Sequence, residues 1–342
     1  MSVLRSSKAK LRSDSMNRLS PVMQQTMRGI PKNATEINFT DSGLEEIPLK
    51  LFSLVQMQKL CLNYNQITTI PSKISKLQNL TLLHCQRNKL LILPEELGQL
   101  RHLQSLDIGK NSIKYLPFSI NLGSLRELEI YMNQFSSLPD QIGKMQKLEK
   151  LSAYVNRLNF LPESLSSLTN LQILDVASNA IAELPQGMQH CTALREFNIS
   201  CNKLAVLPPF IGKLTKLELL DLRCNRITRI PPEIKTATSL QRLLLADNEI
   251  KEIPEEIGCL GGLTHLEVSR NLLQGLPDSI ANLGKLVELI VPENKIKLIP
   301  ENLEGLVSLT FFDIHENQVS NVPKSLLELP RLKRLYLSRN DI

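Results

Sequence analysis

The sequence predicts an α/β repeat fold, a curved horseshoe-shaped solenoid with about 14 short parallel strands on its concave side and short 3₁₀ or α-helical segments on its convex side. Asparagine recurs from Asn65 to Asn340 at steps of 23 residues, with one step of 22 between Asn111 and Asn133. Thirteen of the 19 prolines stand six residues after these asparagines or after Ser42, which takes the equivalent place in the first repeat. A fixed period of this length is typical of stacked supersecondary units.

Each repeat contains one strand, one inward turn and one return segment. The stretch 217–231 reads L-x-x-L-x-L-x-x-N-x-I-x-x-I-P, in which Leu alternates with polar residues as in a strand with one buried face. The Asn amide can satisfy backbone groups of the turn and of the neighbouring repeat, so it is predicted to be structural. Pro then suits the first position of a short helix in the return segment. The predicted structural Asn ladder consists of Asn65, Asn88, Asn111, Asn133, Asn156, Asn179, Asn202, Asn225, Asn248, Asn271, Asn294, Asn317 and Asn340.

Three regions follow from these patterns. Residues 1–19 lack apolar content and are predicted to be a basic disordered tail. Residues 20–33 are predicted to contain a short amphipathic helix that caps the first repeat. Residues 34–342 form the solenoid, and the chain stops two residues after Asn340, so we expect the array to be truncated inside its last repeat.

Composition and charge exclude several function classes. Residues 1–33 hold seven basic residues against one acidic residue, whereas residues 34–342 hold 33 of each, so the solenoid is neutral and no nucleic acid partner is expected. No apolar run is long enough for stable membrane insertion. A signal peptide is not apparent, and the six Cys form no CxxC pairs, which favours a reducing compartment, either the cytoplasm or the nucleus.

The polar positions of the strands predict an acidic row beside a basic row on the concave face. Four residues before the marker Asn stand six acidic residues: Asp107, Glu129, Asp175, Asp221, Glu267 and Asp313. Residues adjacent to the marker are often basic, as at Arg157. The acidic residues can serve charge-complementary docking, or they can simply keep the sheet soluble.

Tyrosines suggest where a partner binds. Four of the five tyrosines (Tyr64, Tyr131, Tyr154 and Tyr336) are predicted to project from the concave side. Tyr131 and Tyr154 occupy the same offset on adjacent strands, and Met132 and Val155 follow them directly. Exposed aromatic side chains on a rigid sheet are typical binding anchors, although a Tyr pair can also merely cover the sheet. We therefore predict a protein-binding surface at Tyr131, Met132, Tyr154 and Val155. Its predicted extensions are Tyr64, Arg157 and the acidic residues Asp107, Glu129, Asp175, Asp221 and Glu267.

One constellation is considered for chemistry. Cys61, His84 and Asp107 share an offset on three consecutive strands, which is the residue set that thiol catalysis uses. Nothing supplies an oxyanion hole, and two candidate ligands are too few for a structural zinc site, so no catalytic, cofactor or metal site is predicted. Cys201 and Cys224 are also expected to be neighbours, as free thiols.

The repeats resemble the leucine-rich-repeat family over residues 34–342. Their return segments, as in Ile253-Pro254-Glu255-Glu256-Ile257-Gly258-Cys259-Leu260, are similar to those of its intracellular Ras-related group. The resemblance implies a non-enzymatic cytoplasmic scaffold in signal transduction, which binds a folded protein on its concave face. It also implies that a Ras-like small GTPase or a phosphatase complex is the partner, although the tail contains no phosphatase-docking segment. The alternative is an enzyme subunit or targeting module whose catalytic part is a partner or a further C-terminal domain. The sequence does not predict the oligomeric state.

Overall fold

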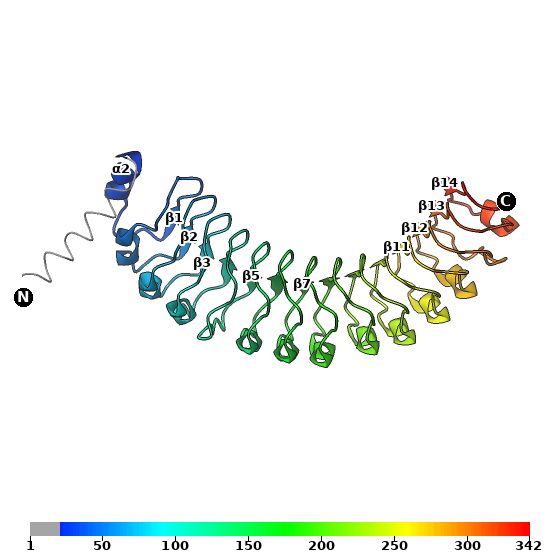
Figure 1. The fold of residues 1–342 in the computed structure, drawn as a ribbon, viewed down its shortest axis with the longest axis horizontal. Coiled ribbons are helices and arrows are strands. Elements are labelled where there is room, and N and C mark those ends of the chain that lie inside the picture. The colour runs from blue at the N-terminus through cyan, green and yellow to red at the C-terminus, as the bar shows by residue number, and fades with distance from the viewer. Residues whose placement is uncertain (1–20) are drawn as a thin grey trace, which may run out of the picture. The chain divides into compact units, whose positions relative to one another are not determined.

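The computed structural model describes residues 21–342, so the predicted basic tail lies outside the described residues. The chain forms two compact units, which divide between Arg157 and Leu158. Fourteen three-residue strands run parallel and follow one another in chain order. Within each unit, the strands lie along one side and most of the short helices lie along the opposite side (Figure 1). These observations confirm the predicted parallel repeat architecture.

The described part of unit 1, from Pro21 onward, contains helix α2 (Pro21–Gly29), six strands and four 3₁₀ helices. The strands are β1 (Glu36–Asn38), β2 (Lys59–Cys61), β3 (Leu82–His84), β4 (Ser105–Asp107), β5 (Glu127–Glu129) and β6 (Lys150–Ser152). The 3₁₀ helices are η1 (Leu49–Ser53), η2 (Ser72–Lys76), η3 (Glu95–Gln99) and η4 (Asp140–Lys144). Helix α2 lies in the segment for which a capping helix is predicted, and its Met27 is buried.

Unit 2 contains eight strands, six 3₁₀ helices and helix α3 (Lys324–Leu327). The strands are β7 (Ile173–Asp175), β8 (Glu196–Asn198), β9 (Leu219–Asp221), β10 (Arg242–Leu244), β11 (His265–Glu267), β12 (Glu288–Ile290), β13 (Phe311–Asp313) and β14 (Arg334–Tyr336). The 3₁₀ helices are η5 (Glu163–Ser167), η6 (Gln186–His190), η7 (Pro209–Lys213), η8 (Pro232–Thr236), η9 (Glu255–Cys259) and η10 (Asp278–Asn282).

The core of each coil consists of the aliphatic residues of the repeat pattern. In the coil of β9, Leu217, Leu220, Leu222 and Ile227 are all fully buried. The central Leu220 pairs in register with Leu243 of β10. Burying each such side chain stabilises the fold by about 1.5–3 kcal/mol, and because a single coil has no second layer, the burial depends on its neighbours.

The marker asparagines hydrogen bond to their own coil and to the preceding one. Asn202 is an example: its Oδ1 accepts from Ile181 N at 2.9 Å, and its Nδ2 donates to Val176 O at 3.0 Å, Ile199 O at 3.1 Å and Ser200 O at 3.1 Å. Every other member of the ladder accepts the equivalent backbone N–H. Each amide therefore satisfies backbone groups that turn away from solvent at the coil edge.

The coil that is one residue shorter keeps its strand register and loses its helix. Leu106 of β4 still pairs with Leu128 of β5. The return segment between these strands forms turns instead of a 3₁₀ helix. The neighbouring coil packs closely against it, because a Cβ on Gly98 would lie 2.2 Å from Ser119 O. The missing residue is thus absorbed outside the strands. The full-length coil between β12 and β13 also has no 3₁₀ helix, so coil length alone does not decide whether one forms.

The position of the repeat proline differs from the prediction. Pro231, for example, precedes η8 as its N-cap residue with φ −71° and ψ 143°, an extended conformation, whereas we expected it to be the first helical residue. Pro232 takes that helical position. The extended conformation brings the chain out of the core before the helix begins, which a proline with a fixed φ favours.

Candidate protein-binding surface

The two predicted tyrosine anchors of unit 1 stack on each other. The ring centroids of Tyr131 and Tyr154 lie 4.8 Å apart, with their planes 5° from parallel. Both residues are half-buried and follow β5 and β6. Because successive coils repeat with the spacing of parallel strands, about 4.8 Å, equivalent aromatic side chains meet face to face.

The Tyr131 ring is also held by two residues of preceding coils. Its hydroxyl donates to Gln86 Oε1 at 2.7 Å, so the side chain spans two coils. Gly109, at the same offset in the coil between them, leaves room for the ring, since a Cβ there would lie 2.5 Å from Cε1 and Cζ of Tyr131. Burial, followed by the charge of Asp107, raises the pKa of the Tyr131 hydroxyl, which therefore stays protonated and remains a donor.

A second aromatic contact of unit 1 extends this region. The Arg87 guanidinium lies 4.9 Å from the ring centroid of Tyr64, which is a cation–π contact. Tyr64, Met132 and Val155 are 45%, 38% and 41% exposed, so they present apolar area to solvent. The tyrosine surface, as we call it, consists of Tyr64, Gln86, Arg87, Tyr131, Met132, Tyr154 and Val155.

The backbone conformation directs the side chains at the edge of this surface outward. Tyr64, Arg87, Met132 and Val155 each precede a marker position and have φ between 50° and 57°. Non-glycine residues seldom adopt this left-handed conformation, and Val pays a particular steric cost in it. The equivalent residue of every described coil has a positive φ, so the turn imposes it, and the side chain is directed outward.

The acidic row contributes less to the surface than its sequence position suggests. Asp107 and Asp221 are only 8% and 4% exposed. Asp107 Oδ1 accepts the backbone N–H of Gly109 at 2.9 Å, and Asp175 and Asp313 do the same for the residue two places on. These aspartates thus close the turn after the strand. Burial raises the pKa of the Asp107 and Glu267 carboxyls.

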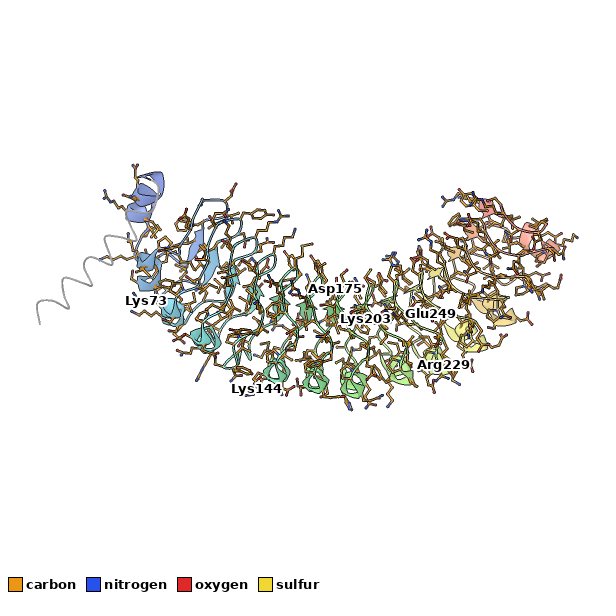
Figure 2. The ribbon with its side chains drawn as sticks, viewed as in Figure 1. Lys73, Lys144, Asp175, Lys203, Arg229 and Glu249 are labelled. Carbon is orange, nitrogen blue, oxygen red and sulfur yellow. The ribbon has the colours of Figure 1, made fainter. Side chains whose placement is uncertain are left out.

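Of the remaining charged candidates, Glu129 and Asp221 are paired with a cation, and Arg157 is exposed. Glu129 of unit 1 forms an ion pair with Lys150 at 2.7 Å. Arg157 of unit 1 is exposed. In unit 2, Asp221 binds Arg223 through two hydrogen bonds of 2.6 and 3.0 Å. Figure 2 shows Asp175 on the strand side of unit 2, whereas Arg229 lies towards the 3₁₀ helices.

Unit 2 carries two features on its strand side that sequence reasoning missed. A hollow of about 250 Å³ lies over β7–β10 and is lined by Asp175, Glu196, Asp221 and Arg242 among others. Further along, the rings of Phe311 and Tyr336 meet edge to face at 5.4 Å, and Arg334 covers Phe311 at 4.5 Å. The shared offset of Phe311 and Arg334 on adjacent strands could have predicted this contact.

The row of Cys61, His84 and Asp107 does not assemble a nucleophile with a base. His84 Nε2 faces Ser105 Oγ at 3.0 Å, and that hydroxyl donates to Glu127 Oε2 at 3.1 Å. Burial raises the pKa of the Cys61 thiol, whereas an activated cysteine needs a lowered one. Over residues 21–342, no group of three or more His, Cys, Asp or Glu is placed to hold a metal ion. Across the same described residues, no helix has the length and apolar character that spanning a membrane requires.

Family models of repeat proteins match most of this chain. A family model described as leucine-rich repeat region matches residues 89–183 and 234–342, and a second one, described as leucine rich repeat, matches residues 192–250. The chain belongs to the leucine-rich-repeat family. Among curated proteins, none matches it in sequence.

Several solved structures share the fold. A leucine-rich-repeat protein of Leptospira interrogans is 29% identical with a TM-score of 0.82, over 92% of this chain and 86% of that protein. The plant peptide hormone receptor RGFR1, solved in complex with RGF2, is 31% identical with a TM-score of 0.79, over 86% of this chain and 50% of the receptor chain. An internalin of Listeria monocytogenes is 25% identical with a TM-score of 0.74, over 84% of this chain and 83% of the internalin. The chain thus spans most of the two bacterial proteins and half of the receptor.

Proposed function

We propose that this protein is a non-enzymatic scaffold that binds a protein partner through the tyrosine surface of unit 1. The observation that carries the proposal is the Tyr131–Tyr154 stack, which Gln86 and Gly109 hold in one orientation. A partner that contacts preorganised rings loses little entropy in ordering them. Aromatic side chains of this kind dominate the binding energy of many interfaces.

The surroundings favour a partner of mixed charge. Arg87 supplies a cation at one side of the tyrosine surface, and Lys150 and Glu129 supply a neutralised pair near the other. A uniformly negative nucleic acid would gain little from such a surface. Leucine-rich-repeat neighbours include a peptide hormone receptor solved with its ligand, which supports binding of a polypeptide.

The experiment compares partner capture by the wild type and by two tyrosine variants. Tyr154→Ala removes one half of the stack, whereas Tyr115→Ala removes a 57% exposed tyrosine that lies outside the tyrosine surface. Proteins cross-linked in cells to each form are quantified by mass spectrometry, and the affinity of the main partner is then measured with purified components. We expect Tyr154→Ala to weaken binding at least tenfold and Tyr115→Ala to leave it unchanged. Equal binding by all three forms would place the interface elsewhere.

We also propose a compartment and a class of partner for this scaffold. The similarity of the return segments to the Ras-related group supports a cytoplasmic role in signalling, with a Ras-like small GTPase or a phosphatase complex as partner. Purified GTPases loaded with GDP or a GTP analogue, together with the phosphatase catalytic subunit, test this directly in binding assays. Nucleotide-dependent binding that Tyr154→Ala removes is the expected result. The alternative function is that of an enzyme subunit. It would apply if the main partner is an enzyme whose catalytic part this chain only holds in position.

A further inference from the structure

Two exposed cysteines lie side by side on consecutive coils of unit 2. Cys201 and Cys224 are both free and exposed, and each stands directly before a marker Asn. Their backbones have the same left-handed conformation, with φ 53° in both. Identical conformations on stacked coils direct the two side chains the same way. The two thiols are near enough to influence each other, because the thiol of Cys201 helps to raise the pKa of Cys224.

The spacing of the coils suits a bond between these sulfurs. Cys201 N donates to Arg223 O at 2.8 Å, and Asn202 N donates to Cys224 O at 3.2 Å, so the two backbones are hydrogen bonded through this stretch. Adjacent strands lie about 4.8 Å apart, which falls inside the range of about 4.4–6.8 Å found between the Cα atoms of disulfides. Closure therefore requires rotation of the side chains and little movement of the backbone.

We propose that Cys201 and Cys224 form an oxidant-sensitive dithiol, a modification site at which hydrogen peroxide closes a disulfide between consecutive coils. One thiolate attacks a peroxide oxygen, the O–O bond breaks, and the departing hydroxide takes up a proton as water, which leaves a sulfenic acid. The second sulfur attacks the sulfenic sulfur, the S–S bond forms, and the S–O bond breaks to release a second water. Two thiols thus lose two electrons and two protons, and one peroxide becomes two waters.

The surroundings determine how the reaction depends on pH. Partial desolvation of its sulfur, followed by the neighbouring thiol of Cys201 and the carboxylate of Asp247, raises the pKa of Cys224 to about 11. Asp247 Oδ2 lies 3.9 Å from Cys224 Sγ. Few Cys224 thiols are therefore ionised at pH 7, and attack by this sulfur is slow there. Between pH 7 and pH 9 the thiolate fraction of Cys224 rises about a hundredfold, so closure should be faster at pH 9.

The test uses the complete chain and mass spectrometry. After exposure to hydrogen peroxide, trypsin digestion without reduction should release peptide 196–203 joined to peptide 224–226, at a mass about 2 Da below the sum of the two free peptides. Dithiothreitol should separate them. Cys259→Ser, which removes another exposed cysteine, is the matched control and should leave the cross-link unchanged.

Single variants distinguish a pair from two independent thiols. In Cys201→Ser or Cys224→Ser, the remaining sulfenic acid has no resolving partner, so labelling by dimedone should rise roughly tenfold over the wild type. Phenylarsine oxide, which bridges two neighbouring thiols, should protect the wild type and Cys259→Ser from oxidation but neither single variant of the pair. The proposal is overturned if the 196–203/224–226 cross-link is absent while Cys259 is oxidised, or if dimedone labels the wild type and the single variants equally. Circular dichroism checks that every variant is folded.

Discussion

Gly109 lacks a side chain at the place where the aromatic ring of Tyr131 lies. A Cβ on Gly109 would be 2.5 Å from Cε1 and Cζ of that ring and 2.9 Å from Cδ1. The ring leans over the preceding coil, its hydroxyl reaches Gln86 one coil further on, and Tyr154 stacks on its other face. The orientation of the tyrosine surface therefore depends on the lack of a side chain at Gly109, in the preceding coil.

We expect Gly109→Ala to displace the Tyr131 ring rather than the backbone, because the clashing atoms belong to the end of a side chain. The loss of the stack and of the Gln86 hydrogen bond should lower the free energy of unfolding by about 1 kcal/mol and weaken partner binding. Denaturant unfolding measures the first effect. Gly123→Ala is the matched control, since nothing lies within 4 Å of a Cβ there. An equal loss in both variants would contradict the proposed packing.

The Tyr131 hydroxyl and the Gln86 amide should be energetically coupled. Tyr131→Phe removes the donor of the 2.7 Å bond, and Gln86→Leu removes its acceptor. A double-mutant cycle of unfolding free energies should give a coupling of about 0.5–1.5 kcal/mol. A coupling of zero within error would mean that water replaces the bond without loss.

Replacing a marker asparagine should lower the free energy of unfolding more than replacing an exposed asparagine elsewhere in the solenoid. Asn202→Ala removes the partner of four backbone groups and should lower the free energy of unfolding by about 1–3 kcal/mol. Asn159→Ala changes an exposed residue and should cost less than about 0.5 kcal/mol. Thermal unfolding of both variants compares them, and similar melting temperatures would refute a structural role for the ladder.

Asp107 should make stability depend on pH. Burial raises the pKa of its carboxyl above the unfolded value, so the folded state binds the proton more tightly, and this contribution to stability grows as the pH falls through the raised pKa. Asp107→Asn has no such titration and keeps an acceptor for Gly109 N, as Asn198 does for Ser200 N. We expect Asp107→Asn to have a higher free energy of unfolding than the wild type at pH 7. This difference in unfolding free energy should shrink on acidification to about pH 4.

Unfolding free energies of wild type and Asp107→Asn across this pH range check the sign. Asp140→Asn, at the start of η4 on the helix side, removes a carboxylate without removing a turn acceptor of the sheet and serves as the control. The prediction is contradicted if the wild type has the higher free energy of unfolding at pH 7 and loses this excess on acidification. That result would mean that the fold stabilises the charged form of Asp107.

Repetition made much of the site predictable. Because equivalent positions recur in register, the common offset of Tyr131 and Tyr154 predicted side chains on neighbouring strands, and the rings do lie 4.8 Å apart. The same reasoning placed Cys201 beside Cys224. It overestimated the accessibility of Asp107 and Asp221, because an offset does not show whether a carboxylate points into solvent or back to its own turn.

The sequence by itself determined the period, the parallel strands, the ladder and the side on which each residue lies, because a 23-residue repeat places every residue type at a constant position in its coil. Tertiary structure alone decided which side chains lean across coils. Tyr131 meets Gln86, 45 positions away in the chain, only because Gly109 leaves the intervening coil open and Tyr154 supports the ring from behind. Side-chain direction depends on the volume and hydrogen-bonding capacity of three different coils at once, and no single repeat pattern contains that information.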